Sequence, residues 1–238
     1  MKVNWGLIKV IVLVGLVVFL YSFTNKRNSA RNLSKIEVEF VDENDPFITL
    51  KTVDKLLIQK YNSVTNVLKE RLVLKEAEKR LLQNDMIRDA QVFITVDGVL
   101  GAKIEQRNPV ARVAAINDFY IDADGKKMPL SKVYSARVPL VTGNIETDFT
   151  VLTSLLLTIR DDNFLNQTIV GLHVSKNNFV IMKVRKQDFQ VNFGKLIDED
   201  KKFQNFKAFY QQALNDGTLS EYKSVDLQFG SQVVATKK

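Results

Sequence analysis

Carboxylates are the main side chains of this chain that could catalyse a reaction. Two acidic clusters stand out, Asp161 with Asp162 and the run Asp198, Glu199 and Asp200. A carboxyl pair could share the work of general acid and general base in a hydrolase. The clusters also fit helix boundaries, because the second opens a predicted helix and the first lies at a helix end or the turn beyond it. A hydrolase therefore stays open as one interpretation.

Other catalytic and metal-binding side chains are scarce. The chain has no cysteine and a single histidine, His173. Thiolate nucleophiles, Fe–S clusters, disulfides and multi-histidine metal sites are thereby excluded within one chain, and a Ser-His-Asp triad would need that one imidazole. His173 lies in an alternating segment typical of a strand, which favours a structural or surface role. With no glycine-rich phosphate loop, HExxH or GxSxG motif, the sequence predicts no enzyme, no cofactor and no metal site.

Charge is spread evenly along the chain. There are 34 lysines and arginines against 27 aspartates and glutamates, which gives a net charge of +7. Nucleic-acid surfaces usually show a dense basic tract or interleaved aromatics, and neither is present. We expect no nucleic-acid partner, and at most a mild attraction to anionic lipid near residues 26–35.

One long apolar segment, residues 5–23, lies near the N-terminus. As a helix it would span roughly 28 Å, close to the hydrocarbon thickness of a bilayer. Lys9 lies near one end, while Trp5 and Tyr21 suit the two interfaces. The segment predicts a transmembrane helix. A cleaved secretory signal is the alternative, although no small-x-small cleavage site follows Phe23.

The flanking charges leave the orientation open. Lysine and arginine are denser after the apolar segment than before it, which favours a cytoplasmic C-terminal part. Against this bias, a long C-terminal domain behind a short tail is often exported whatever the flanking charge.

The first half of the remaining chain predicts a small unit of two helices on a three-stranded sheet. A polar stalk, residues 24–33, precedes an alternating strand, residues 36–40. Thr52 can cap a first helix, and Leu74 begins the inner side of a second. Two alternating segments then flank Asp97 and Gly98, the strongest hairpin signal in the chain.

The second half is rich in strands. We expect strands at 111–115, 119–122 and 138–141, a helix at 148–160, an antiparallel meander at 168–174, 179–184 and 189–193, and extended segments at 225–229 and 232–236. A helix capped by Asp198 and stopped by Gly217 carries an apolar stripe, which we interpret as its core face: Phe203, Phe206, Phe209, Tyr210 and Leu214. The terminal strand would have a free edge.

This layout and several local strings resemble the FtsQ/DivIB family of bacterial cell-division proteins. The matching pieces are Ile36–Phe40, Glu105 with Pro109–Ala111, Tyr120–Asp122 with Gly125, Pro139–Gly143, and Val225–Leu227. The resemblance implies an α+β fold with an N-terminal transmembrane helix, a POTRA domain (strand-helix-helix-strand-strand) and a curved antiparallel β domain with helices. Its boundaries would be a cytoplasmic tail 1–4, a transmembrane helix 5–23, a stalk 24–33, a POTRA domain 34–107 and a β domain 108–238.

By the same resemblance, the protein would be a non-catalytic scaffold of the divisome that links early and late division proteins. It would cross the inner membrane once at the septum, with a cytoplasmic N-terminus and periplasmic domains. Its partners would be FtsB and FtsL, with a segment of FtsB added as a strand beside the last strands. The corresponding residues here are Tyr222, Phe229, Gln232, Val233, Val234 and Ala235.

The sequence departs from the family in three places. Gln228 replaces a common arginine, the N-terminal tail is short, and Asp97 with Gly98 stands where many members have proline. Any ion pair made by that arginine is therefore missing or rebuilt. A POTRA-type chaperone for envelope proteins remains the alternative function, although such proteins usually repeat the POTRA unit or add a barrel.

Overall fold

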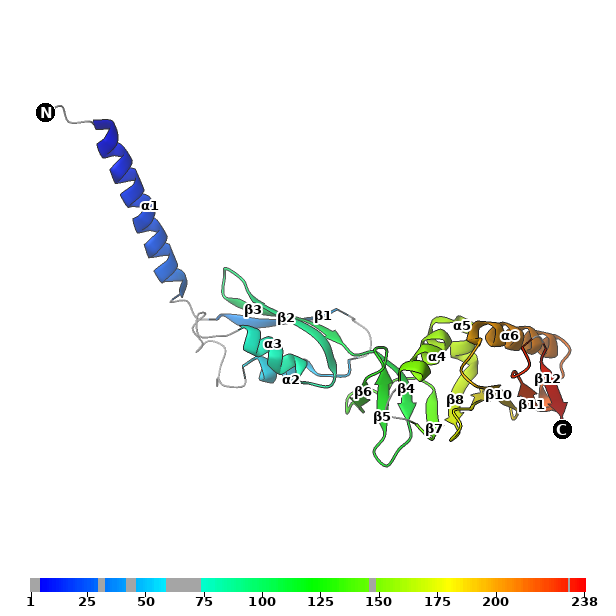
Figure 1. Cartoon of the computed structure of the whole chain (residues 1–238). Helices are drawn as coiled ribbons and strands as arrows, with labels where there is room; N and C mark the ends of the chain where they lie inside the picture. Colours follow the sequence, from blue (N-terminus) through cyan, green and yellow to red (C-terminus); the bar gives the residue numbers. More distant parts are fainter. Residues whose placement is uncertain (1–4, 30–32, 42–45, 59–73, 146–148, 231) are drawn as a thin grey trace. The chain divides into compact units, whose positions relative to one another are not determined.

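The computed structural model describes residues 5–29, 33–41, 46–58, 74–145, 149–230 and 232–238. The chain divides after Gln106 into two units, Met1–Gln106 and Arg107–Lys238. Figure 1 shows the elements of each unit.

The N-terminal helix α1 runs from Trp5 to Ser29 and is longer than the apolar segment. Its residues Ile8–Arg27 are long and apolar enough to cross a membrane, a test that a signal sequence also passes. Residues 24–29, directly after Phe23, contain no proline or glycine that would stop the helix. Lys26 and Arg27 in its last turn complement the negative end of the helix dipole. The helix therefore runs on through the first part of the expected stalk.

After α1, the described residues of the first unit form two helices and three strands. Its elements are β1 (Lys35–Phe40), α2 (Leu50–Leu57), α3 (Leu74–Leu82), β2 (Ile87–Ile94) and β3 (Val99–Gln106). The sheet order is β1-β3-β2, with β1 parallel and β2 antiparallel to the central β3. Alternate apolar side chains of the sheet and the inner faces of both helices form one core. The predicted hairpin is confirmed, with Gly98 at φ 83° in its turn.

The start of α2 differs from the expectation. Thr49, not Thr52, is the N-cap, and its Oγ1 accepts a hydrogen bond from the Thr52 amide at 3.2 Å. Both threonines suit a cap by residue type, and the extended backbone of Thr49 decides between them.

The residues that the structure describes in the second unit form a nine-stranded sheet with helices on one side (Figure 1). Its strands are β4 (Pro109–Val113), β5 (Phe119–Asp122), β6 (Lys127–Pro129), β7 (Leu140–Gly143), β8 (Ile169–Val174), β9 (Val180–Val184), β10 (Gln190–Gly194), β11 (Tyr222–Asp226) and β12 (Val234–Lys237). Its helices are α4 (Thr150–Asp161), α5 (Asn163–Thr168), α6 (Glu199–Asn215) and the 3-10 turn η2 (Leu219–Glu221). The order across the sheet is β12-β11-β10-β9-β8-β7-β4-β5-β6.

The sheet is mixed, so the expected antiparallel β domain was wrong in this respect. The meander β8-β9-β10 is antiparallel as predicted, but β4 with β7, β7 with β8, and β10 with β11 are parallel pairs. The helices explain two of these pairs, because α4 and α5 connect β7 to β8 and α6 connects β10 to β11. A helical crossover returns the chain to the end where it began and so makes the next strand parallel.

Aromatic side chains of α6 pack on the strands beneath it. Phe203 lies 5.1 Å from Phe193 between ring centroids, and both side chains are buried. Phe206 is buried as well, whereas Leu214 is exposed, so its assignment to the core face was wrong. Ala213 is buried instead of Leu214, because Ala213 lies on the side of α6 that packs against the sheet.

Helix α6 ends as predicted but begins differently. Gly217, at φ 69°, follows the C-cap as expected for a helix stop. Asp198 is the N-cap residue, but its backbone is left-handed at φ 52° and its side chain makes no capping hydrogen bond. Buried Lys202 holds the preceding loop, since its Nζ donates to the backbone oxygen of Lys195 at 2.7 Å.

Candidate functional site

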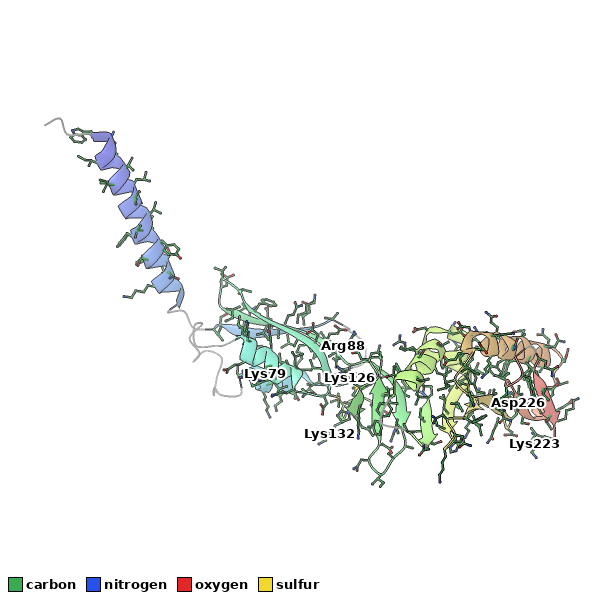
Figure 2. All side chains as sticks on the ribbon, in the orientation of Figure 1. Lys79, Arg88, Lys126, Lys132, Lys223 and Asp226 are labelled. Atoms are coloured by element: carbon green, nitrogen blue, oxygen red, sulfur yellow. The ribbon has the colours of Figure 1, made fainter. Side chains whose placement is uncertain are left out.

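The last strand, β12, lies at one edge of the nine-stranded sheet. It pairs antiparallel with β11, with Val225 opposite Ala235 and Asp226 opposite Val234. No other described strand pairs with it. Lys223 and Asp226, labelled in Figure 2, mark the neighbouring strand β11.

The hydrogen-bond alternation determines which backbone groups of β12 point outward. The Leu227 amide donates to the Asn192 oxygen of β10 at 3.0 Å. The N–H and C=O groups of successive residues in a strand point alternately toward its two neighbouring strands. In β11 the N–H and C=O of the odd-numbered residues therefore point toward β10, and those of the even-numbered residues, such as Asp226, point toward β12. Val234 and Thr236 must then bond to β11. The N–H and C=O of Ala235 and of Lys237 then lie in the plane of the sheet and point outward, away from β11.

Side chains along β12 alternate between the two faces of the sheet. Val233 and Ala235 are partly buried against the core under α6. Val234 is 41% exposed and belongs to the opposite face. A strand added beside β12 would therefore meet a backbone edge with an apolar lining on its helix side.

A hollow of about 320 Å³ lies between α6 and this edge. Its walls come from α6, from the start of β11 and from the residues just before β12: Asn205, Ala208, Phe209, Gln212, Ala213, Asp216, Tyr222, Gln232 and Val233. The rings of Phe209 and Tyr222 meet edge to face at 5.1 Å between centroids. The hollow is thus part apolar and part lined by amides and one carboxylate.

The structure brings together some of the six residues expected to bind a partner. Tyr222, Gln232 and Val233 line the hollow, and Ala235 lies on the adjoining edge. Val234 is on the other face. Phe229 is about half exposed in the connection between β11 and β12, where its oxygen accepts a hydrogen bond from the Gln232 amide at 3.2 Å.

Sequence reasoning missed the wall that α6 contributes. Asn205, Ala208, Phe209, Gln212 and Asp216 recur at three and four positions, so they share one helix face. This spacing could have identified the face. The sequence prediction instead placed Phe209 with the other aromatic residues on the core face of the helix. In the structure Phe209 is only partly buried.

Gln228, which stands where the family commonly has arginine, binds a nearby carboxylate. Its side-chain Nε2 donates to Asp226 at 3.0 Å, and its amide donates to the same carboxyl group at 2.9 Å. An amide–carboxylate hydrogen bond thus exists where an ion pair would be expected. The Gln228 side chain also lies against Gly194, where a Cβ would meet it at 2.5 Å.

Ion pairs hold the end of β12. Lys237 Nζ lies 2.7 Å from Glu221, and Lys238 Nζ lies 3.4 Å from Asp188. The hydrogen bond that Lys237 donates to Glu221, together with the negative charge of that carboxylate, raises the pKa of Lys237. These solvent-exposed pairs connect the C-terminal end of the strand to η2 and to the turn before β10, while no described strand pairs with its outer backbone edge.

The first acidic cluster, Asp161 with Asp162, has structural partners. Asp161 pairs with Arg160 at 2.7 Å, and Asp162 pairs with Lys207 and accepts the Leu165 amide at 2.9 Å as the N-cap of α5. The hydrogen bond from Arg160 lowers the pKa of Asp161, and that from Lys207 lowers the pKa of Asp162. Both carboxyl groups are thereby held in the charged form, which does not suit a general acid.

The other residues considered for catalysis, Glu199 and His173, make their contacts away from the hollow. Burial, with the neighbouring Asp200 charge, raises the pKa of Glu199 in the first turn of α6. His173 is exposed on β8, and its Nδ1 lies 3.0 Å from Thr142 Oγ1 of β7. Neither Glu199 nor His173 lines the hollow.

Comparison with known proteins gives one family match. A family model described as FtsQ/DivIB, C-terminal related, matches residues 108–236, more than half of the chain. No curated protein matches the chain.

Proposed function

Because the chain belongs to the FtsQ/DivIB C-terminal related family, we propose that it is a non-catalytic scaffold of bacterial cell division. The family match supports a role in cell division. One N-terminal apolar helix in a member of a division-protein family indicates a single-pass membrane protein. The scaffold would link early and late division proteins by holding them at the membrane.

We propose that the partner is an FtsB/FtsL pair, and that a segment of FtsB adds as a strand to β12. The observation that carries this proposal is the open edge of β12, with the N–H and C=O of Ala235 directed away from the sheet. A strand laid along that edge would make backbone hydrogen bonds that give affinity, and its alternate side chains would give selectivity.

The hollow beside the edge supports the same mode of binding. Alternate side chains of an added strand would face the helix side of the sheet, where Val233 and Ala235 already point. A volume of about 320 Å³ is large enough for one apolar or aromatic side chain in contact with Phe209 and Tyr222. This anchor would work like the buried central residues that dominate many protein interfaces.

The first folded unit supports the rest of the proposed arrangement. Over its described residues the elements follow one another as β1, α2, α3, β2 and β3, and this coarse order supports the proposal of a POTRA domain (strand-helix-helix-strand-strand) at residues 34–107. Residues 1–4 would be cytoplasmic, 24–33 would form a stalk whose residues 24–29 continue helix α1, and the β domain, 108–238, would lie in the periplasm at the septum. The POTRA-type chaperone remains the alternative use of this unit.

Proline substitution on β12 tests strand addition. Ala235→Pro removes the outward N–H without breaking a bond to β11, so capture of FtsB and FtsL should be lost while the fold remains. Ala235→Ser keeps the N–H and should keep capture. Co-purification from membranes measures binding, and circular dichroism checks the fold. Undiminished capture by a folded Ala235→Pro protein would exclude the proposed edge.

Val234→Pro provides the contrasting variant. It removes an N–H that bonds to β11, so β12 itself should detach and thermal stability of the second unit should fall. If Val234→Pro and Ala235→Pro behaved alike in both stability and capture, the assigned direction of the backbone groups would be wrong.

A reporter enzyme fused after Lys238, active only outside the cytoplasm, tests orientation. Depletion of the protein in the same strain tests the division role, and cells should filament when it is lost. A reporter active in the cytosol would contradict the periplasmic placement, and normal division after depletion would contradict an essential scaffold role.

A further inference from the structure

We propose that the β2–β3 turn, Thr95–Gly98, contacts the lipid bilayer surface, with Val96 at the boundary between headgroups and acyl chains. The proposal rests on α1 lying in a membrane and does not depend on partner capture at β12.

The turn lies at the point where the chain enters the folded part of the first unit that follows α1, residues 33–106. Leu33 is buried in the core of that unit. The next residue, Ser34, donates its amide to the Gly98 oxygen at 2.8 Å, and Lys35 pairs with Val99. The turn is therefore fixed beside the covalent connection to α1.

That connection is short. Five residue steps separate Ser29, the last residue of α1, from Ser34, so the chain can extend at most about 17 Å there. Six helical steps from Phe23, where the apolar segment ends, add about 9 Å. The headgroup layer takes up roughly 5–7 Å of that length. The opposite end of the eight-residue strand β3 lies about 24 Å further along the strand.

The turn has the chemistry of a shallow membrane contact. Val96 is 75% exposed at its tip, and Phe93, 50% exposed, lies on the sheet face against Gly101. The Thr95 amide donates to the Val99 oxygen at 2.9 Å, and the Gly98 amide donates to the Thr95 oxygen at 3.1 Å. Because these polar groups are already bonded, the turn can enter the interface without exposing them to an apolar medium.

The charges around the turn favour a shallow position. Asp97 occupies the turn itself, and a carboxylate is costly below the headgroups. Lys26 and Arg27 lie in the last turn of α1, and Lys35 begins β1. These cations suit the headgroup level, where Asp97 would also remain. Val96 would then reach the acyl boundary, and no deeper.

The absence of cysteine in the chain permits a direct test. Val96→Cys in the full-length protein is labelled with an environment-sensitive fluorophore and reconstituted in phosphatidylcholine–phosphatidylglycerol nanodiscs. The matched control is Leu82→Cys, also exposed, at the end of α3 just before β2 begins at the far end of the hairpin. We expect a blue-shifted emission at position 96 that shallow doxyl-labelled lipids quench severalfold more strongly than at position 82.

Two outcomes would overturn the proposal. Equal, water-like emission and equal quenching at both positions would show that the turn stays in solvent. A blue shift at position 96 without quenching by labelled lipid would show that a protein surface, such as a second copy of the chain, covers it. Circular dichroism of both labelled proteins establishes that the fold is intact, and a Val96→Asp change at the tip should not alter it, because the side chain is exposed.

Discussion

Asp162 performs two tasks at the junction of α4 and α5. It caps α5 by accepting the Leu165 amide, and it forms an ion pair with Lys207 of α6. One side chain therefore ties the short helix α5 to its own first turn and to a neighbouring helix. Both contacts favour the charged carboxylate, which is why the pKa of Asp162 is lowered.

Replacing Asp162 should separate the two tasks. Asp162→Asn keeps a good capping side chain but loses the ion pair, which should lower the free energy of unfolding by about 1 kcal/mol or less. Asp162→Ala loses the cap as well, at a further cost of about 1 kcal/mol. Thermal and urea unfolding at pH 7 measure both differences, and equal stability of the two variants would argue against the capping role.

The pH dependence of this effect has a definite sign. A carboxyl group whose folded-state pKa is lowered stabilises the fold fully above its ordinary pKa, and this contribution is lost as the pH falls through the lowered value. The difference between the original protein and Asp162→Asn should therefore shrink below about pH 4. A difference that stayed constant into that acid range would exclude the Lys207 pair as its source.

Residue types and spacing could predict some single residues and not others. Gly98 and Gly217 were recognised from local signals, because a turn and a helix stop each need a left-handed backbone that glycine adopts easily. The cap of α2 and the backbone of Asp198 were not, because several residues nearby suit a cap by type alone. The contact between Gln228 and Asp226 could be posed as a question but needed coordinates to be answered.

At the scale of elements, α6 forms the wall of the hollow beside β12. Its exposed Ala208 is a lining residue with a small side chain. On the same helix, Leu214 is exposed but does not line the hollow. The helix thus offers two exposed positions that differ mainly in which side of it they occupy.

Filling the hollow should block partner capture. Ala208→Trp would place an indole where a partner side chain is proposed to insert, so capture of FtsB and FtsL should fall at least tenfold, equivalent to about 1.4 kcal/mol. Leu214→Trp adds a similar bulk elsewhere on α6 and should leave capture unchanged. Titration of the purified proteins measures the affinities. Equal affinities for the two tryptophan variants would mean that the hollow takes no part in binding.

Long and strongly periodic elements were predicted well, and short or non-local ones were not. The meander β8-β9-β10 follows from alternation within each strand. Strand β6 has only three residues, and α5 has six that run directly into β8, so both are shorter than the windows in which a periodic pattern can be recognised. The parallel pairs depend on where a helical crossover returns the chain, which no local pattern specifies.

At the scale of the whole molecule, each unit has a core of its own. One core draws its buried residues from positions 33–104 and the other from positions 110–227, with none in common. Leu81 of α3 and Leu155 of α4 are both fully buried, one in each core. They offer the same substitution in two separate environments.

Local stability should follow this division. Leu81→Ala and Leu155→Ala each remove a buried side chain and should cost about 3–5 kcal/mol in the unit that contains it. In hydrogen exchange of the full-length protein in detergent, Leu81→Ala should speed exchange within residues 33–106 only. Leu155→Ala should do so within residues 107–238 only, because the cores share no residues. Faster exchange across both units in response to either change would mean that the two cores unfold as one cooperative body. A destabilising change in the first unit would then also destabilise β12 and its open edge.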